Sequence, residues 1–489
     1  MKPAAQLQTC IELLTLLASE ARPSDTLLSG YFRSHRFIGA KDRSAIASRV
    51  YAMLRHHARL SWWVNYLTNG NVMPAQAGIH EKPQAKTSGL SWTPAFAGVT
   101  KGEVRTRMIV YLSLVENLDA KSVAALFEGE KYAPPLLDEG EKKLLGSLTG
   151  RTLHHPDMPQ AVALECPDWA YEKLQGVFGA NLEKELQAML TEAPLDLRVN
   201  LLKATRDEAR AALKKAGIEA ASTPISPLGL RVTGRPALAA TEVFKNGWVE
   251  IQDEGSQRVA ALVEAKPGMS VVDFCAGAGG KTLGLAASMR NKGRVIACDV
   301  LGGRLKRARL RFRRAGAHNI EVRELTNEND QWVKHNAGKH DRVLVDAPCS
   351  GLGVWRRNPD ARWKNLGPQL SELTALQARI LQSAARLVKP GGRLIYATCS
   401  LLPEENEKQI EAFLAAHQDF RLVSLSEITM PLKEPVIPAK AGIQHRASRD
   451  AACEASGWMP AFAGMTYLRL TPARHGTDGF FAAVMERRI

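Results

Sequence analysis

The chain has 489 residues, which is long enough to bury a substantial core and corresponds to about three domains of ordinary size. Hydrophobic residues make up 45% and charged residues 24% of it, so a disordered, collagenous or disulfide-scaffold protein is excluded. Its 65 Lys and Arg against 50 Asp and Glu give a net charge of +15, which favours a polyanionic partner, most often a nucleic acid and sometimes a membrane surface.

The apolar segments are too short for a membrane span, which needs roughly 18 residues. The stretch Ile11–Leu17 is interrupted by Glu12 and Thr15, and we interpret it as an amphipathic helix rather than a signal peptide. The seven cysteines are an odd number without a CxxC pair, which is typical of a reducing compartment. We therefore expect a cytoplasmic protein with no membrane partner and no bound metal.

Residues 1–165 are predicted to form a helical N-terminal region, because apolar residues recur at helical spacing from about residue 5 to 66. The arginines of this region are interpreted as a solvated helical face rather than as an RNA contact.

Two distant segments repeat each other. Residues 73–100 begin with MPAQAGIH and end with WTPAFAGVT, and residues 436–466 begin with VIPAKAGIQ and end with WMPAFAGMT. Both are rich in Ala, Gly and Pro and lack a periodic apolar face, and two separated copies do not make a solenoid. We interpret them as insertions that form exposed loops without a catalytic role. Cys453 and Trp458 lie inside the second copy and are assigned no chemistry.

Residues 166–255 are predicted to form a small α+β module. Such a module ahead of a catalytic domain could present a nucleic acid, although no aromatic stacking signature is visible. The predicted elements are helices over 168–191 and 205–216, the second capped by Thr205, and strands over 195–200, 229–233 and 248–252.

Residues 256–489 alternate between buried strands and helices, which predicts an α/β, Rossmann-like, doubly wound parallel sheet. In that architecture ligands bind at the carboxyl ends of the strands. The predicted strands cover 270–274, 294–299, 341–346 and 393–398, and the predicted helices cover 281–289, 304–314 and 370–388.

A Gly-rich turn, Asp273–Thr282 (DFCAGAGGKT), follows the first of these strands. Glycines there let the backbone approach a ligand, and the next helix supplies free amides. A phosphate loop would need Gly in place of Cys275, and a dinucleotide GxGxxG from Gly277 would need Gly in place of Thr282, so neither pattern is met. Asp299 ends the next strand, where a carboxylate can bond a ribose diol, which fits any adenosine-bearing cofactor.

Two cysteines follow later strands in the same way. Cys349 lies in DAPCSGLG and Cys399 in YATCSLLPEENE. A lone cysteine at a strand end is more often a packed small hydrophobe than a nucleophile, but two at equivalent ends, each followed by Ser, favour a function. A thiol has a pKa of about 8.5 unless the site lowers it, for which Lys281, Arg356 or Arg357 are candidates.

These three motifs resemble, in order and spacing, those of the RsmB/NOP/Sun family of RNA 5-methylcytosine methyltransferases, and DGFFAAV resembles the family's closing strand. The resemblance covers most of residues 165–489 apart from the segment 436–466. It implies S-adenosylmethionine as cofactor and RNA as partner, with ribosomal RNA the first candidate and transfer RNA the second.

The resemblance also implies roles for single residues. Cys399 is expected to add to C6 of the cytosine, Cys349 to help release the product, and Asp346 to orient the base. The base is expected to leave any local stacking. The expected cofactor-binding residues are Cys275, Ala276, Gly277, Ala278, Gly279, Gly280, Lys281, Asp299 and Asp346.

The chain departs from the family's pattern in two places. The usual Ala-Pro of the turn is Gly277-Ala278 here, which we expect to be tolerated because backbone amides do the binding. The Asp that the family places near the adenine has no counterpart in EVRELTNENDQWVK, where Glu324 and Asn327 are weak substitutes.

Basic residues just after Cys349 are predicted to hold phosphates beside the target base. Trp355 and Trp363 could stack on bases or pack, and we favour packing. The stretch Arg304–Arg314 has seven basic residues and no acidic one, which favours contact with an RNA backbone over a solubilising face. The predicted phosphate contacts are Arg356, Arg357, Arg362 and Lys364.

We therefore predict methylation of cytosine C5 in RNA. A DNA cytosine enzyme would use a Pro-Cys nucleophile, which Cys349 alone fits, but the second cysteine argues against it. A catalytically inactive RNA-binding assembly factor is disfavoured by the presence of both cysteines, Lys281 and Asp299, and a nicotinamide dehydrogenase by the unmet GxGxxG. The oligomeric state stays open.

Overall fold

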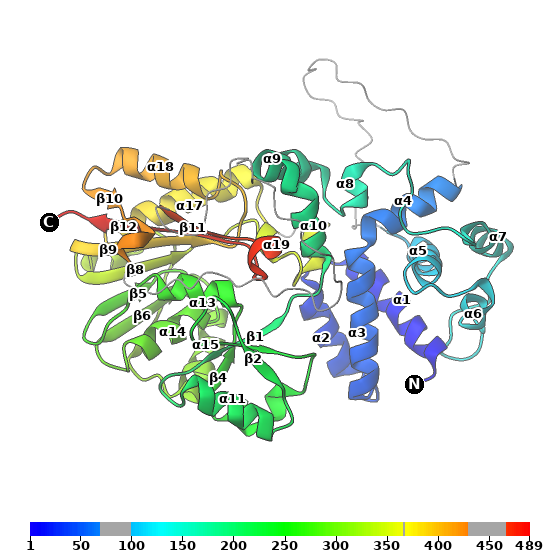
Figure 1. Ribbon diagram of the computed structural model, residues 1–489, viewed down its shortest axis with the longest axis horizontal. Helices are drawn as coiled ribbons and strands as arrows, with labels where there is room; N and C mark the ends of the chain where they lie inside the picture. The colour runs from blue at the N-terminus through cyan, green and yellow to red at the C-terminus, as the bar shows by residue number, and fades with distance from the viewer. Residues whose placement is uncertain (69–98, 365–366, 429–465) are drawn as a thin grey trace, which may run out of the picture. The chain divides into compact units, whose positions relative to one another are not determined.

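The computed structural model describes residues 1–68, 99–364, 367–428 and 466–489 (Figure 1). They form two compact units. The first unit contains Met1–Thr191 and Trp355–Pro368, and the second contains Glu192–Val354 and Gln369–Ile489. The repeated segments 73–100 and 436–466 lie almost entirely outside the described residues. The three-part division at residues 165 and 255 stays a prediction.

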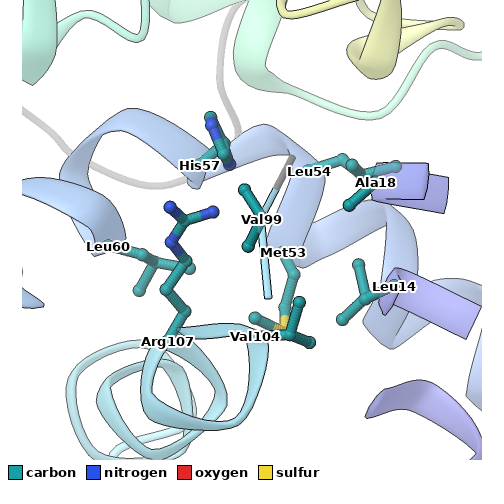
Figure 2. Close-up of a pocket in the computed structure, with 9 residues that line it drawn as sticks. All are labelled: Leu14, Ala18, Met53, Leu54, His57, Leu60, Val99, Val104 and Arg107. Carbon is teal, nitrogen blue, oxygen red and sulfur yellow. The ribbon is translucent and has the colours of Figure 1, made fainter. Parts of the chain in front are cut away.

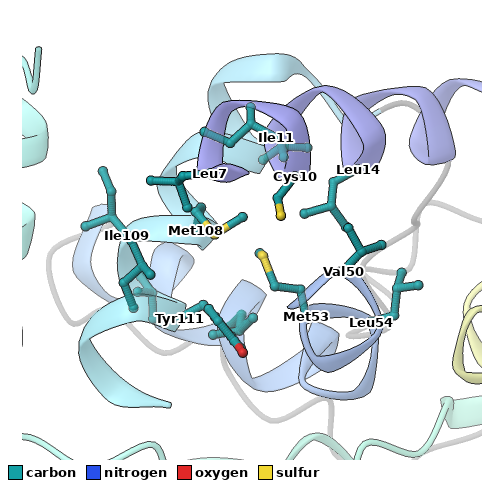
Figure 3. Packing of buried hydrophobic residues seen from close by; sticks show 14 of the residues in the cluster. Leu7, Cys10, Ile11, Leu14, Val50, Met53, Leu54, Met108, Ile109 and Tyr111 are labelled. Atoms are coloured by element: carbon teal, nitrogen blue, oxygen red, sulfur yellow. The ribbon is translucent and has the colours of Figure 1, made fainter. Parts of the chain in front are cut away.

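The first unit is helical, as predicted. Most apolar residues of its first helix, at a spacing of three or four positions, are buried, so they form one face that packs against α3 and α5. Figure 3 shows Leu7, Ile11 and Leu14 facing Met53 and Met108 across this core. Its helices are α1 (Pro3–Ser19), α2 (Ser24–Ser34), α3 (Ala40–Arg55), α4 (His57–Thr68), α5 (Lys101–Leu114), α6 (Ala120–Ala125), α7 (Glu139–Leu148), α8 (Gln160–Ala163), α9 (Asp168–Phe178) and α10 (Leu182–Leu190).

A small cavity lies inside this helical core. Its volume is about 20 Å³, enough for one water molecule but not for a cofactor. Apolar side chains surround it, and Figure 2 shows the Arg107 guanidinium directed towards it beside Leu60 and Val99. Burial lowers the pKa of Arg107.

The single helix predicted over 168–191 is wrong. The chain forms two helices there, because α9 ends at Phe178 and Gly179 takes a positive φ of 50°. A residue without Cβ adopts that conformation at little cost, so the chain turns before α10 begins at Leu182. Both helices bury one apolar face in the first unit.

The second unit contains a small antiparallel sheet with strand order β2-β3-β1-β4. The helix α11 (Arg206–Lys215) packs beside it and starts with a capping box between Thr205 and Glu208, which confirms the predicted cap. Strand β2 was not predicted, since its three residues carry no apolar pattern. The strands are β1 (Leu195–Val199), β2 (Ala220–Ser222), β3 (Gly229–Val232) and β4 (Val249–Ile251), and a short α12 (Glu242–Lys245) precedes β4.

The described residues also form an eight-stranded sheet, which confirms the doubly wound prediction. Its strand order is β10-β12-β9-β8-β5-β6-β7, with β11 paired to β12. The strands from β9 to β7 are parallel, and β12 closes the sheet antiparallel to β9. They are β5 (Ser270–Asp273), β6 (Arg294–Asp299), β7 (Ile320–Glu324), β8 (His340–Asp346), β9 (Val388–Thr398), β10 (Phe420–Leu422), β11 (Tyr467–Leu470) and β12 (Phe480–Arg487).

Helices cover both faces of this sheet, as Figure 1 shows. Successive strand residues face opposite sides, so Val271 packs in the core under α13, α14 and α15, whereas Val272 packs in the core under α17 and α18. The helices are α13 (Glu254–Ala261), α14 (Gly280–Ser288), α15 (Gly302–Ala315), α16 (Gln331–His335), α17 (Leu370–Ala385), α18 (Glu407–Ala416) and α19 (Pro472–His475). No helix in the described parts of the chain is both long and apolar enough to cross a bilayer.

The strand order fixes where a ligand can bind. From β5 the chain moves outward through β6 to β7 and then returns to the other side of β5 to form β8. This reversal opens a crevice at the carboxyl ends of β5, β6 and β8. The Gly-rich turn, Asp299 and Asp346 all lie at those ends.

The stability of the second unit is expected to fall in acid because of His340. This side chain is 2% exposed, stacks on Trp332 and shares a hydrogen bond of 2.8 Å with Ser270 Oγ. Burial, with the charge of Arg294, lowers its pKa to about 4, so the unfolded chain binds the proton first as the pH falls below about 6.5.

Between about pH 6.5 and 4 the free energy of unfolding of the unsubstituted protein should fall by up to about 3 kcal/mol because of His340. His340→Gln should lack this loss, which urea unfolding at each pH measures. Exposed His335→Gln is the matched control and should follow the unsubstituted protein. Equal pH slopes for both variants would contradict the role of His340.

Candidate active site

A cavity of about 740 Å³ lies at the crevice of the second unit. This volume is in the range of pockets that hold cofactor-sized molecules. The Gly-rich turn forms one wall, the residues after β7 form another, and Cys349 and Cys399 line the remaining side. The sequence-predicted cofactor and catalytic residues are therefore brought together, except Gly279, which is not part of the lining.

Two glycines give the turn its shape. Gly277 and Gly279 have φ values of 55° and 77°, a backbone region that residues with a Cβ rarely adopt. Gly279 caps α14, and a Cβ there would lie 2.4 Å from the Phe312 ring. The start of α14 is tied to β5 because Thr282 Oγ1 donates a hydrogen bond of 2.7 Å to Asp273 Oδ2. The result is a rigid turn whose backbone faces the cavity.

Asp299 supports that turn from the next strand. It is 6% exposed, and its two oxygens accept hydrogen bonds of 2.8 Å from the amides of Gly277 and Leu301. An ionised carboxylate has about four lone-pair sites, so two remain after these bonds. Asp299 also lines the cavity, so it has the capacity to accept from a ribose diol, and that role stays a prediction.

Lys281 and Asp346 form an ion pair across the cavity floor. Lys281 Nζ lies 2.6 Å from Asp346 Oδ2 and 5.6 Å from the centre of the Phe480 ring on the closing strand. Burial lowers the pKa of Lys281, but the Asp346 charge and hydrogen bond raise it above its ordinary value. Lys281 therefore carries a fixed positive charge at pH 7, and half of the Asp346 carboxylate stays available to a ligand.

The two cysteines meet at the end of the cavity. Their Sγ atoms are 3.4 Å apart, within hydrogen-bond range for sulfur. The Gly353 amide donates to the Cys399 carbonyl over 2.9 Å, and a Cβ on Gly353 would lie 2.4 Å from the Gly479 carbonyl. Only glycine allows this close approach, which explains the last residue of DAPCSGLG.

The surroundings of Cys349 and Cys275 disfavour the ionisation of their thiols. The hydrogen bond to Cys399 and burial raise the pKa of Cys349, and the charges of Cys399 and Glu405 raise it further. Burial also raises the pKa of Cys275, with the nearby carboxylates of Asp273 and Asp346 adding to it.

Glu405 is a site residue that sequence reasoning missed. It is fully buried beside the two cysteines, and its carboxylate accepts bonds from the Ser350 amide and hydroxyl, from the Ser400 hydroxyl and from Gln377 Nε2. The serine that follows each cysteine was the available signal, because a hydroxyl removed from solvent needs a hydrogen-bond partner.

The segment after β7 forms another wall of the cavity. Leu325, Thr326, Asn327 and Glu328 line it. Of the two weak substitutes for the missing Asp, Asn327 lies in the wall, whereas Glu324 does not line the cavity and lies against Gly302 instead. Glu328 was not predicted, and its carboxylate is paired with Arg379 at 2.8 Å.

The prediction that Arg356 and Arg362 hold RNA phosphates is wrong, whereas that for Lys364, which is partly exposed, stays a prediction. Arg362 is 3% exposed, and its guanidinium donates to the carbonyls of Glu165 and Met189 inside the first unit. Arg356 is 4% exposed, and Lys364 donates to the carbonyls of Glu20 and Arg22. Arg357 is partly exposed and stays a prediction.

The same segment carries two tryptophans. Trp355 is 1% and Trp363 7% exposed, so packing, the favoured interpretation, is confirmed. The Arg362 guanidinium lies 5.0 Å from the Trp355 ring, and Trp363 Nε1 donates to the Leu54 carbonyl. These contacts anchor Trp355 and Trp363 in the first unit.

We expect Arg362→Met to lower the free energy of unfolding by about 3 kcal/mol, because two buried carbonyls lose a charged donor. Urea unfolding measures this, with exposed Arg36→Met as control, which should change stability by less than about 0.5 kcal/mol. Weakened RNA binding with unchanged stability would instead restore the surface role.

The fold and the site define a Rossmann-like methyltransferase domain preceded by a ferredoxin-like module. The family model described as 16S rRNA methyltransferase RsmB/F matches residues 260–486, and the ferredoxin-like domain model of RsmF/B-like methyltransferases matches residues 166–238. A methyltransferase homologue protein from Pyrococcus horikoshii, with a solved structure, is 28% identical, with a TM-score of 0.53 over 68% of this chain and 100% of its own.

Two curated relatives extend the match. Ribosomal RNA small subunit methyltransferase B of Klebsiella pneumoniae is 31% identical over 79% of this chain and 84% of its own length. A probable protein of the same name from Synechocystis is 38% identical over 52% of this chain, and the alignment spans only 57% of that relative's length. The chain belongs to the RsmB/F family, which confirms the predicted RsmB/NOP/Sun resemblance and its cofactor, S-adenosylmethionine.

Proposed function

We propose that this chain transfers a methyl group to C5 of a cytosine in RNA, with ribosomal RNA as the first candidate. The observation that carries the proposal is the pair of thiols, Cys349 and Cys399, 3.4 Å apart in the wall of the cofactor-sized cavity. The printed names of the relatives, ribosomal RNA small subunit methyltransferases, support ribosomal RNA.

The chemistry of cytosine explains why a thiol is needed. C5 is a poor nucleophile until a thiolate adds to C6 and makes C5 enamine-like. We assign this addition to Cys399, whose Sγ forms the bond to C6 while C5 takes the methyl group that S-adenosylmethionine supplies. Loss of the C5 proton to a base and breakage of the Sγ–C6 bond, with its electron pair leaving on sulfur, then restore the aromatic ring and the Cys399 thiolate. Cys349 is the candidate for assisting this release.

Asp346 is the candidate for orienting the base. One of its oxygens accepts from Lys281, and it is 30% exposed towards the cavity. A carboxylate fixed in this way can accept a hydrogen bond from the exocyclic amine of a cytosine. A base that reaches it must leave the stack, as in other enzymes that act on base atoms.

The residues present fit S-adenosylmethionine. Gly277, Ala278 and Gly280 line the cavity, Asp299 has lone pairs that are not used, and Asn327 offers an amide in another wall. Thus the turn would hold the methionine part, Asp299 the ribose and Asn327 the adenine side. Asn327 would then take the place of the Asp that the family has near the adenine, with an amide that can both donate and accept hydrogen bonds.

Helix α15 is the candidate surface for the RNA backbone. Of its seven cations, Arg311 and Arg314 are paired with Glu250, while the others are exposed and form no ion pair among the described residues. A one-sign array of this kind is typical of phosphate contact. These others are Arg304, Lys306, Arg307, Arg309 and Arg313.

Removal of two of these charges is expected to reduce the salt dependence of RNA binding. For Lys306→Gln/Arg309→Gln, the slope of log affinity against log salt should fall by about 1.4, or about 0.7 for each contact with single-stranded RNA. Lys121→Gln/Lys143→Gln removes the same charge from exposed sites of the first unit and should leave the slope unchanged. Equal slopes for both variants would contradict the surface.

The activity itself is tested with labelled S-adenosylmethionine and total bacterial RNA. Label is expected at cytosine C5 of ribosomal RNA, and Cys399→Ala should reduce it to background. Cys349→Ala should trap a covalent protein–RNA adduct on a denaturing gel, and the double variant should lose that adduct.

Each other outcome has a meaning. Label in transfer RNA would change the substrate and keep the chemistry. Transfer that survives Cys399→Ala would overturn the nucleophile assignment. Absence of label with a folded, cofactor-binding protein would favour the alternative, a catalytically inactive RNA-binding assembly factor.

A further inference from the structure

The second unit contains another cavity, which shares no lining residue with the active site. Its volume is about 330 Å³, at the lower end of the range of pockets that hold small ligands. Arg198 on β1 and Ser226–Leu228 before β3 form one wall, and α13 and α14 form the others. Helix α13 lies beside both α14 and β1 (Figure 1), so the cavity is enclosed between the small sheet and the large one.

Arg258 of α13 lines this cavity and is a buried cation without a partner. Its side chain is 0% exposed, and none of its three guanidinium nitrogens has a hydrogen-bond partner among the described residues. A buried guanidinium without a partner destabilises the folded chain, and an anion bound beside it would offset that cost.

The acidic residue one helical turn away is engaged elsewhere. Glu254 precedes Arg258 on α13, but its Oε1 accepts from the amides of Ile225 and Ser226. Its Oε2 lies 3.8 Å from Nη2 of Arg231, with which it forms an ion pair. Glu254 therefore does not form an ion pair with Arg258 in this structure.

A second guanidinium reaches the same cavity. Arg198 is 4% exposed and donates from Nη1 to the Gly280 carbonyl over 2.7 Å and to Gln252 Oε1. Its buried Nε has no partner in the part of the chain that the structure describes. Gly284 of α14 makes room for this side chain, because a Cβ there would lie 2.9 Å from Nη1. Since Gly280 belongs to the cofactor turn, Arg198 connects the two cavities.

Both guanidinium groups are charged at neutral pH. Burial lowers the pKa of Arg258 to about 10, although the charge of a nearby glutamate raises it, and burial lowers that of Arg198 to about 10 as well. Exposed Lys266 adds a third positive charge to the lining, and Glu264, which also lines the cavity, is paired with Arg393. The lining therefore has an excess of positive charge.

We propose that this cavity binds a phosphate group, with the guanidinium groups of Arg258 and Arg198 as its ligands. A guanidinium presents its N–H donors in a planar fork that matches phosphate oxygens, and one phosphate can accept from two such forks. Pro227, Leu228 and Ala260 supply an apolar wall for the rest of a nucleotide. The phosphate comes from an RNA backbone or from a free phosphate ester, and only the RNA source rests on the proposed function.

The test is calorimetric titration of the full chain with inorganic phosphate at constant ionic strength, with chloride as the reference anion. We expect one site in the unsubstituted protein. Arg258→Met removes the charge and should weaken phosphate binding by about tenfold or more, because charge-assisted hydrogen bonds are lost. Arg210→Met, exposed on α11 of the same unit, is the matched control and should bind phosphate unchanged.

Filling the cavity tests the site without a change to either arginine. Ala261→Leu enlarges a side chain in the lining and should weaken phosphate binding as Arg258→Met does. Circular dichroism verifies that each variant is folded. Absence of phosphate binding in the unsubstituted protein, or unchanged binding in a folded form of either variant, would overturn the proposal.

A single-stranded RNA oligonucleotide distinguishes the two sources of the phosphate. If RNA supplies it, saturating RNA should abolish the phosphate titration, and Arg258→Met should lower the slope of log RNA affinity against log salt by about 0.7. If a free ester supplies it, RNA-bound protein should still bind inorganic phosphate, and the slope should not change. Either result supports the site. A lack of methyl transfer would overturn the proposed function and leave the phosphate titration unaffected.

Discussion

The parallel pairing of β8 with β9 is the constraint on which the site depends. The register aligns Asp346 with Ala397, so the two strands end together. Cys349 and Cys399 follow those ends, and short backbone bonds such as that from the Gly353 amide to the Cys399 carbonyl draw the loops together. A slip by two residues would move one thiol roughly 6.6 Å along its strand and separate the pair. Sheet register therefore sets a sulfur–sulfur distance.

The carboxylates of the second unit act as supports at the same edge of the sheet. Asp273 accepts from Thr282 at the start of α14, Asp299 accepts from the amides of Gly277 and Leu301, and Glu405 accepts from the loops after β8 and β9. Each one converts a loop that lacks regular hydrogen bonds into a fixed wall of the cavity. A carboxylate is suited to this because two oxygens can accept from several donors at once.

The sequence allowed prediction of the parts of the fold whose signal is local. The central strands β5, β6 and β8 are runs of buried apolar residues, and their predicted bounds agree with the structure within a residue. Strand β7, Ile320–Glu324, was missed because alternate residues of an edge strand are charged, and β10 was missed because it has only three residues. The break at Gly179 was missed because the helical period continues on both sides of it.

The site residues also fall into those that local sequence predicts and those that it does not. The cofactor turn and both cysteines were found because each motif is contiguous in the chain. The roles of Arg362 and Glu405 were not found because they depend on tertiary partners, Glu165 and Met189 for the first and Ser350 and Gln377 for the second. Closeness in sequence to Cys349 favoured a phosphate contact for Arg362, but its burial keeps its charge away from solvent.

Helix α15 shows where part of the net positive charge lies on the surface. Composition alone gives a net charge of +15 but not its location. Glu250 on β4 pairs with Arg311 and Arg314 and leaves five exposed cations and no acidic residue on the rest of the helix. The same helix contributes Arg304 to the wall of the cavity. A polyanion held by these cations would thus lie beside the pocket in which the two thiols meet, and long-range attraction and local chemistry would act on one strand of nucleic acid.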